Sequence, residues 1–266
     1  MSIYQALADL EENNLSGAVC TIIQSQGSTP RHEGSKMLVY PDGKILGSIG
    51  GGELESRVIA EAYNAINDGK TRLLTYNMTD PQKGDPGVCG GQLQIYIEPV
   101  RPNATIVIIG AGHVGKAVAH LASWLGFRVV INDDRADLCN PDSIPGGNEY
   151  FPIPMSELPQ HFTITSSTYL VLLTRGVEVD LEGLPTLLDT PAAYIGVIGS
   201  RRRWAVTRKK LLEMGINEQK ISRVHSPMGL DLKAEKPEEI ALSIMAEIML
   251  LHHGADGKPL SQGGTS

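Results

Sequence analysis

A Gly-x-Gly-x-x-Gly run is the feature of this sequence most able to do chemistry. The run, Gly110-Ala111-Gly112-His113-Val114-Gly115, follows the apolar residues 106–109 and precedes apolar positions at helical spacing. In such a run the first glycine makes a tight turn, the second admits a pyrophosphate, and the third lets the helix pack on the strand. The helix N-terminus adds free N–H groups and partial positive charge. We therefore predict cofactor contacts at Gly110, Gly112, His113 and Gly115.

An acidic residue follows the glycines at the distance that a nucleotide site requires. A predicted strand at 127–131 ends in Asn132-Asp133-Asp134-Arg135, which puts Asp133 about 20 residues beyond the glycines. A carboxylate at this place can accept the hydroxyl groups of a ribose, and we assign this role to Asp133 or Asp134. The alternative is a Rossmann-like domain that holds another ligand or none, because fold does not fix function.

A second glycine cluster, Gly50-Gly51-Gly52, stands between a predicted hairpin and a predicted helix at 54–66. Close backbone approach and a helix N-terminus again favour an anion. Arg31 closes the turn-like segment Gly27-Ser28-Thr29-Pro30-Arg31 and can bind an anion with two hydrogen bonds. The alternatives are a strained turn without a ligand and an ordinary surface arginine.

Cys89 lies in a segment rich in turn-forming residues, 80–91, and is followed by Gly90 and Gly91. Backbone N–H groups in such a loop can stabilise a thiolate, so we predict a reactive cysteine with Gly90 and Gly91 beside it. The alternative is an incidental loop cysteine. Cys20 lies in a predicted strand, where a small buried hydrophobic residue is expected.

Further candidates stand at the carboxyl ends of predicted strands at 168–173 and 192–198. Ligands of open α/β sheets bind beyond these ends, which points to Thr174 and to Gly199 and Ser200. Three arginines, Arg201–Arg203, follow at a predicted helix start. They can bind phosphate or form a solvated helix face, and we expect one of them to matter.

The elements that position these residues predict an α/β protein with two domains. Residues 1–100 form an N-terminal α+β domain, with a helix at 3–12, strands at 18–24, 71–78 and 93–98, and a hairpin turning at Asp42-Gly43. Residues 104–255 form a Rossmann-like domain with a mainly parallel sheet, whose last helix begins near Pro237. Residues 256–266 are rich in glycine and serine and are expected to be a disordered tail.

The composition is that of a globular protein. The 266 residues are 41% hydrophobic and 20% charged, with a net charge of −7, which argues against a general nucleic-acid partner. No apolar run reaches the ~18 residues of a membrane span, and residues 1–9 lack the features of a signal peptide. Three widely separated cysteines suit a reducing cytoplasm.

Together these segments resemble the xanthine dehydrogenase accessory protein family, also called XdhC/CoxI, over about residues 5 to 252. The resemblance rests on the order and number of the following motifs: Gly27-Ser28-Thr29-Pro30-Arg31, Gly47-Ser48-Ile49-Gly50-Gly51-Gly52, Cys89-Gly90-Gly91, Gly110-Ala111-Gly112-His113-Val114-Gly115, Asp133-Asp134-Arg135, Tyr194-Ile195-Gly196-Val197-Ile198-Gly199-Ser200, Pro227-Met228-Gly229-Leu230-Asp231 and Pro237-Glu238-Glu239-Ile240-Ala241.

The resemblance implies a cytoplasmic, often dimeric chaperone of molybdenum cofactor. Such a protein binds the cofactor, supports its sulfuration by a cysteine desulfurase, and hands it to a xanthine dehydrogenase-type molybdenum hydroxylase. Cys89 would then be a ligand of molybdenum or a sulfur relay, since soft sulfur suits that metal. Family members often carry histidine after the threonine of the third Rossmann strand, where this chain has Arg175. We therefore expect Arg175 to contact an anion and not to transfer a proton.

Two other functions stay open at this point. The Rossmann-like unit favours a nicotinamide-dependent oxidoreductase that binds NAD(P) or another nucleotide, although the sequence shows no evident general acid for hydride transfer. A scaffolding partner of a large enzyme is the third alternative. We expect an accessory factor more than a free-standing enzyme.

Overall fold

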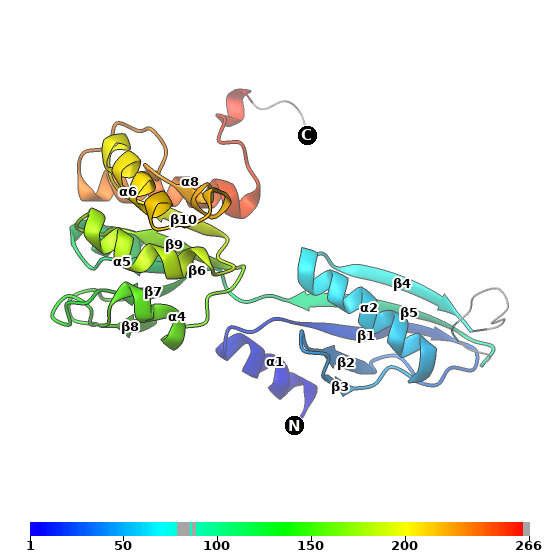
Figure 1. The fold of residues 1–266 in the computed structure, drawn as a ribbon. Coiled ribbons are helices and arrows are strands. Elements are labelled where there is room, and N and C mark those ends of the chain that lie inside the picture. The colour runs from blue at the N-terminus through cyan, green and yellow to red at the C-terminus, as the bar shows by residue number, and fades with distance from the viewer. Residues whose placement is uncertain (79–85, 87–88, 263–266) are drawn as a thin grey trace. The chain divides into compact units, whose positions relative to one another are not determined.

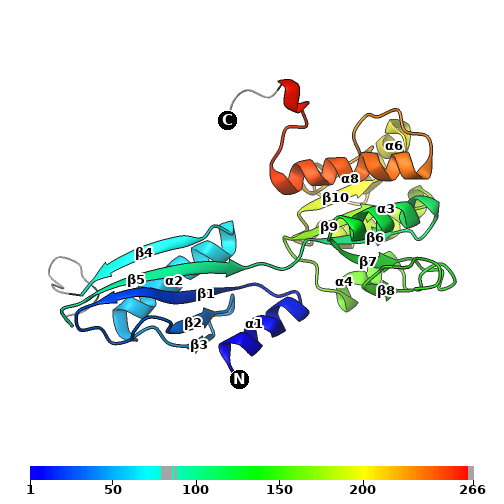
Figure 2. The same ribbon diagram turned by 180° about the vertical axis from the view of Figure 1, so that it is seen from behind.

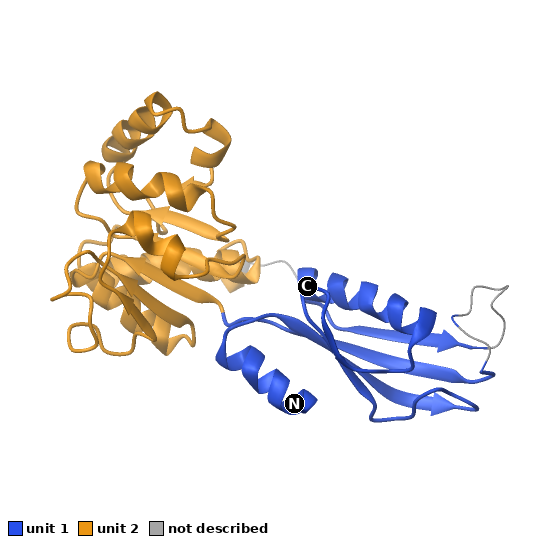
Figure 3. Ribbon diagram, turned by 60° about the horizontal axis from the view of Figure 1, so that its bottom comes forward, with its two compact units in different colours: residues 1–103 blue, residues 104–266 orange. Residues whose placement is uncertain are grey.

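The structure, a computed structural model, describes residues 1–78, 86 and 89–262. The chain divides into two compact units, Met1–Asn103 and Ala104–Ser266, drawn in blue and orange in Figure 3. Each unit has its own sheet and its own hydrophobic core. Of the predicted loop 80–91, only Pro86 and residues 89–91 belong to the described part of the chain.

Unit 1 is an antiparallel five-stranded sheet with the strand order β3-β2-β1-β5-β4. Its elements, in chain order, are α1 (Ile3–Glu12), β1 (Gly17–Gln26), β2 (Lys36–Val39), β3 (Ile45–Gly47), α2 (Gly52–Asp68), β4 (Arg72–Asn77) and β5 (Gln92–Val100). The predicted hairpin is confirmed, since β2 and β3 pair antiparallel. An antiparallel sheet with helices is the predicted α+β arrangement.

One face of the unit 1 sheet is covered by α2, as Figures 1 and 2 show from opposite sides. The helix buries an apolar stripe that includes Leu54, Val58 and Ala62, and the strands contribute Cys20 and Ile22 to the same core. Alternation along β5 puts every second side chain into this core, which is the pattern of a strand with one buried face. Burial explains the predicted role of Cys20 and raises the pKa of its thiol to about 12.

Unit 2 is a six-stranded sheet with the order β11-β10-β9-β6-β7-β8, and all its strand pairs are parallel. Its strands are β6 (Thr105–Ile109), β7 (Arg128–Asn132), β8 (Glu149–Phe151), β9 (Thr168–Leu172), β10 (Tyr194–Val197) and β11 (Val224–His225). Its helices are α3 (His113–Trp124), α4 (Leu158–His161), α5 (Val177–Leu188), α6 (Arg201–Glu213), α7 (Glu218–Ile221) and α8 (Pro237–His253), with short 3₁₀ turns η2 (Met155–Glu157) and η3 (Leu260–Gln262).

Helices cover both faces of the unit 2 sheet. In Figure 1, α5 and α6 lie in front of the sheet, and Figure 2, seen from behind, shows α3 and α8 on its other face. Two separate apolar cores result, one under α3 and α8 and one under α5 and α6. Strands β6 and β9 are buried at every residue, as expected of parallel strands that lie between two helical layers. The predicted Rossmann-like domain is confirmed.

The strand order reverses beside β6, and this reversal forms a crevice at one end of the sheet. The chain runs from β6 outward to β7 and β8, then returns to place β9 on the opposite side of β6. The connections after β6 and β9 therefore diverge from each other and leave a crevice at the carboxyl ends of these strands, where open α/β sheets bind ligands.

Two details differ from the sequence-based expectation. Helix α5 begins at Val177, after the N-cap Gly176, whereas we expected Asp180 to open it. Asp180 instead faces inward and is fully buried. Of the predicted tail, residues 260–262 form η3, and residues 263–266 lie outside the described part of the chain.

Candidate functional site

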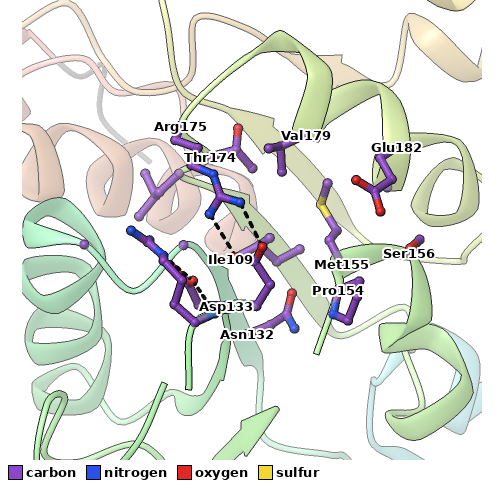
Figure 4. A pocket seen from close by; sticks show the side chains of 16 residues that line it. Ile109, Asn132, Asp133, Pro154, Met155, Ser156, Thr174, Arg175, Val179 and Glu182 are labelled. Atoms are coloured by element: carbon purple, nitrogen blue, oxygen red, sulfur yellow. Dashed lines mark hydrogen bonds and ion pairs between the residues drawn. The ribbon is translucent and has the colours of Figure 1, made fainter. Parts of the chain in front are cut away.

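A pocket of about 310 Å³ lies at the crevice of unit 2. It is lined from several elements by Gly112, Asn132, Asp134, Met155, Arg175 and Val179, among others. Figure 4 labels four of these side chains, which come from the end of β7 (Asn132), from η2 (Met155), from the segment after β9 (Arg175) and from α5 (Val179). The volume is at the lower end of the ~300–1,000 Å³ of ligand pockets, which suits part of a nucleotide-sized molecule.

The three glycines of the turn after β6 have different surroundings. A Cβ on Gly110 would lie 2.6 Å from the carbonyl oxygen of Leu173, and one on Gly115 would lie 2.1 Å from the carbonyl oxygen of Gly110. A Cβ on Gly112 would meet no atom of the described chain within 4 Å. The first and third glycines therefore permit close packing, and the second leaves open space at the N-terminus of α3. His113, the first residue of α3, is exposed. Phosphate binding at this turn stays a prediction.

Asp133 is held inside the protein. Its Oδ2 accepts hydrogen bonds from Ala111 N at 2.7 Å and from Arg135 Nη2 at 2.7 Å, and its Oδ1 accepts from Arg135 Nε at 2.8 Å. Burial raises the pKa of this carboxyl, but the hydrogen bonds from Arg135 and Ala111 outweigh burial and lower the pKa to about 2. Both oxygens are thus engaged in fixing the glycine turn, which leaves Asp133 poorly placed to accept a ribose hydroxyl.

Asp134 is the more accessible acid at the pocket. Its carboxylate accepts hydrogen bonds from Arg175 Nη1 at 2.9 Å and Arg175 Nη2 at 2.8 Å, a bidentate pair that Figure 4 marks with dashed lines. The hydrogen bonds from Arg175 lower the pKa of Asp134. This pair joins the end of β7 to the end of β9, so the anion that Arg175 contacts in this structure is the chain's own carboxylate.

Asn132, which the sequence analysis did not select, has an unpaired oxygen in the pocket wall. Its Nδ2 donates to Phe151 O at 2.9 Å and to Ile153 O at 2.8 Å. Its Oδ1 is buried and has no hydrogen-bond partner among the described residues. The sequence feature that could have pointed to Asn132 was a polar amide directly after three buried apolar residues of β7.

A buried ionic network supports the pocket from behind. Arg203 donates from Nη2 to Asp180 Oδ2 at 2.7 Å and to Thr174 Oγ1 at 2.7 Å, and Thr174 also donates to Asp180. Asp180 is completely buried, so its charge needs the arginine. Arg203 is therefore the one of the three arginines with a defined structural role, and it positions Thr174 in the pocket wall.

Gly199 and Ser200 do not line this pocket. Ser200 is the N-cap of α6, where its Oγ accepts from Arg203 N at 3.2 Å. Gly199 lines a second cavity of about 540 Å³ beyond the end of β10. The structure thus separates these two candidates from the glycine turn after β6, and their cofactor contacts stay predictions.

In unit 1, three motifs that are distant in sequence come together. A Cβ on Gly91 would lie 2.4 Å from Ser28 O, and a Cβ on Gly50 would lie 2.7 Å from Pro30 Cγ. The segments 27–31, 50–52 and 89–91 are therefore neighbours, and we call them the glycine cluster. Cys89 is an exposed free thiol and Arg31 is exposed, so both can meet a ligand at this cluster.

One amide of the glycine cluster, that of Gly51, and two donors just before the cluster already have an anionic partner in Glu55. Glu55 Oε2 accepts from Ser48 Oγ at 2.8 Å, from Ile49 N at 3.2 Å and from Gly51 N at 3.2 Å. Gly50, Gly51 and Gly52 all have positive φ, a conformation that favours glycine. The run of three glycines therefore has a conformational reason, and a carboxylate of this chain holds part of the predicted anion cradle.

Within residues 1–78, 86 and 89–262, no group of three or more His, Cys, Asp and Glu side chains is arranged to hold a metal ion. Among the helices that the structure describes, none combines the length and the apolar character that a bilayer span requires. Cys139 is buried, and burial raises the pKa of its thiol.

Fold and pocket define a protein with a Rossmann-type unit that contains a pocket at its crevice, preceded by an α+β unit that carries an exposed cysteine. Residues 106–248 match the XdhC Rossmann domain, and residues 10–77 match the XdhC and CoxI family. The chain therefore belongs to the XdhC and CoxI family, as its motifs led us to expect.

Two proteins of Escherichia coli are similar to this chain over most of its length. The chain is 36% identical to the uncharacterized protein YqeB of Escherichia coli K12 over 97% of its own length, but it spans only 47% of YqeB. It is 23% identical to the molybdenum cofactor insertion chaperone PaoD of E. coli K12, covering 90% of this chain and 86% of PaoD.

A solved structure has the same fold. The crystal structure of a Bacillus halodurans protein described as a xanthine dehydrogenase (BH1974) aligns with a TM-score of 0.51. The alignment covers 99% of this chain and 98% of that chain at 22% sequence identity. At this identity the likeness concerns the fold alone.

Proposed function

We propose that this protein is a chaperone of molybdenum cofactor that supports sulfuration of the cofactor and its insertion into a xanthine dehydrogenase-type hydroxylase. The observation that carries the proposal is the convergence of three family motifs at one place in unit 1, with the exposed thiol of Cys89 among them. The similarity to PaoD along most of both chains supports the same function.

The residues present fit the cofactor as a ligand. Molybdenum cofactor is a pterin dithiolene with a phosphate, and it supplies the redox-active metal to the enzyme that receives it. Taken by itself, unit 2 offers open space at Gly112 and the N-terminus of α3, which suit a phosphate group of a bound ligand. In unit 1, the exposed thiol of Cys89 is a soft ligand that suits molybdenum or a transferable sulfur atom.

The partners follow from this function. A cysteine desulfurase would supply sulfur, and the hydroxylase would receive the loaded cofactor. We place the protein in the cytoplasm, where such enzymes mature, and we expect a homodimer. In this role the chain binds and protects a ligand and turns over no substrate of its own.

The test compares two cysteine substitutions in the full chain. Cys89→Ser keeps the size and polarity of the side chain and removes the easily ionised sulfur, so molybdenum content per protein and hydroxylase activation should fall sharply. Cys20→Ser is the matched control, because Cys20 is fully buried in unit 1. It should cost stability, on the order of 1–3 kcal/mol, and leave molybdenum retention unchanged in the folded protein.

Equal molybdenum retention and equal activation in the wild type and in Cys89→Ser would reject the role of Cys89. Both variants are to be purified from cells that make molybdopterin, with molybdenum measured by elemental analysis. A melting curve for each variant separates loss of the ligand from loss of the fold.

A nicotinamide-dependent oxidoreductase is the second candidate. The strand order of unit 2 and the open glycine turn favour it, since both are features of dinucleotide-binding domains. Absorbance and pterin fluorescence of the purified protein, before and after addition of NAD or NADP, separate the two functions. Bound pterin supports the chaperone, whereas tight dinucleotide binding without pterin supports the oxidoreductase.

A further inference from the structure

We propose that the unit 2 pocket selects a planar nitrogen heterocycle with an amino group, and that Asn132 Oδ1 is the acceptor that recognises this group. The proposal deepens the proposed function, on which it rests only in treating this pocket as a ligand site. It names a specificity-determining residue and the chemical class of its ligand.

The orientation of the Asn132 amide is fixed by its neighbours. Its Nδ2 lies 2.9 Å from Phe151 O and 2.8 Å from Ile153 O, and both of these carbonyl oxygens can only accept. Rotating the amide by half a turn would place Oδ1 against two other oxygens, which is unfavourable. The atom without a partner is therefore the acceptor, and what it needs is an N–H or O–H donor.

An unpaired buried acceptor is rare and unfavourable, because it has lost water without gaining a hydrogen bond. Asn132 is only 1% exposed, and Oδ1 finds no partner in the part of the chain that the structure describes. Since Asn132 lines the pocket, a donor from a bound molecule can fill this position. In Figure 4 the Asn132 side chain projects toward Pro154 and Met155 at the pocket wall.

The surroundings of Asn132 favour a flat aromatic ring. Ile109, Pro154, Met155 and Val179 line the pocket with apolar surface. Met155 is an unbranched side chain that adapts its shape to neighbouring groups, and it lines the same pocket as Asn132. A ring between these side chains would bury its faces and point a polar edge at Asn132.

The groups around Asn132 do not favour an anionic group at this end of the pocket. The carboxylates of Asp133 and Asp134 are paired with Arg135 and Arg175, and Glu182 adds a further acid to the lining. A phosphate would meet the acceptor oxygen of Asn132 without a donor to pair with. The phosphate of the ligand therefore belongs at the open glycine turn, and the amino-bearing ring belongs at Asn132.

Two kinds of ligand share this chemistry, a nucleobase and a pterin. Matched pairs that differ only by the amino group distinguish them: AMP with purine riboside 5′-monophosphate, GMP with IMP, and 6-hydroxymethylpterin with its 2-desamino analogue. Binding of each compound to the full chain is measured by isothermal titration calorimetry. In at least one pair we expect the amino compound to bind at least about tenfold more tightly, as for sites that hydrogen-bond a substrate N–H.

Substitution of Asn132 tests whether this residue is the source of the selectivity. Asn132→Leu removes the acceptor at similar volume, so the ratio of the two affinities should fall to within twofold. Arg175→Ala is the matched control on the pocket rim. It should change both affinities of a pair by the same factor and keep their ratio. A melting curve shows whether Asn132→Leu folds, and the wild-type pairs test the proposal even if it does not.

Equal affinities within every pair in the wild type would overturn the proposal, and so would selectivity that persists in folded Asn132→Leu. The result also separates this proposal from the chaperone function. Selectivity without any effect of Cys89→Ser on molybdenum retention would support the pocket assignment and reject the role of Cys89 in the chaperone function. Molybdenum loss in Cys89→Ser with equal affinities within every pair would do the reverse.

Discussion

Each unit of this protein has a glycine-rich turn whose backbone amides bind a carboxylate of the chain itself. In unit 2 the carboxylate is Asp133, which follows the neighbouring strand and is paired with Arg135. In unit 1 it is Glu55, which lies in the helix that the glycines precede. The first carboxylate comes from a neighbouring strand, about twenty residues away along the chain, whereas the second comes from the first turn of the helix that directly follows the glycines.

The turn of unit 2 is therefore open to a ligand, whereas in the turn of unit 1 a side chain of the protein already occupies the amides. In unit 2, Asp133 binds the N–H of Ala111, and the next residue, Gly112, faces open space. A ligand can therefore approach without displacing any contact of the chain. In unit 1, a ligand that needs the N–H groups of Ile49 or Gly51 has to compete with Glu55. Four substitutions test this contrast.

The largest effect is expected for Gly115→Ala in unit 2. The new Cβ would lie 2.1 Å from the carbonyl oxygen of Gly110, so the turn or the helix must move, at a cost of about 3 kcal/mol. Gly112→Ala is the control, with open space around its Cβ, and should cost less than about 1 kcal/mol as an N-cap change. Trp124 and Trp204, the chain's two tryptophans, lie in unit 2, so urea unfolding followed by their fluorescence reports this unit. Equal losses in both variants would contradict the assignment.

The next effect concerns pH and Asp133. The pKa of this carboxyl is about 2 in the folded protein, compared with an ordinary value of 3.8. Ionised Asp133 therefore stabilises the fold above about pH 4, by about 2 kcal/mol. This contribution disappears as the pH falls from about 4 to about 2. Asp133→Asn should thus lose stability at neutral pH and approach the wild type under acid conditions. A stability difference that is constant between pH 2 and 6 would reject this role.

A smaller effect is expected for Glu55→Gln in unit 1. The amide keeps the shape of the side chain but removes the charge that strengthens its hydrogen bonds, at a cost of about 1 kcal/mol. The amide protons of Ile49 and Gly51 should exchange faster with solvent, as NMR can measure. Inorganic phosphate should shift these signals more than in the wild type, because the competing carboxylate is gone. Unchanged exchange rates would show that Glu55 does not hold the turn.

The smallest effect on stability is expected for Arg175→Ala. The Asp134 and Arg175 side chains are 44% and 53% exposed, and ion pairs at that exposure contribute less than about 1 kcal/mol. Since the hydrogen bonds from Arg175 lower the pKa of Asp134, this pKa should rise toward its ordinary value in the variant. NMR titration of the Asp134 carboxyl carbon measures that shift. Loss of stability as large as for Gly115→Ala would show that the ion pair is structural.

Much of the fold could be predicted because its signals are local. The apolar run before Gly110, the alternation along β5 and the Asp42-Gly43 turn each depend on adjacent residues, and each element formed as expected. The limits of α5 were less well predicted, because Asp180 resembles a first-turn acid in sequence. Its buried partners, Thr174 and Arg203, are evident only once the helices have packed.

The site was less predictable because its decisive contacts are not local. Asp133 was correctly located beside the glycines, but its contacts with Ala111 and Arg135 could not be read from spacing. Asn132 was missed because its importance comes from the carbonyl groups of Phe151 and Ile153, which lie in and after another strand. Glu55 was missed because its contacts with the amides of Ile49 and Gly51 depend on how the chain turns between β3 and α2, which the spacing of the residues does not show.

The return of the chain to β9 has a consequence for biosynthesis. Thr105 at the start of β6 pairs with Thr168 at the start of β9, so the central pairing of unit 2 closes a long loop. Contacts of such high sequence separation form slowly, and a chain emerging from the ribosome cannot make this one until β9 has been synthesised. The crevice residues Gly112 and Arg175 lie on opposite sides of that pairing. Ligand binding at the crevice would therefore act as a late checkpoint, available only to chains in which β9 has paired with β6.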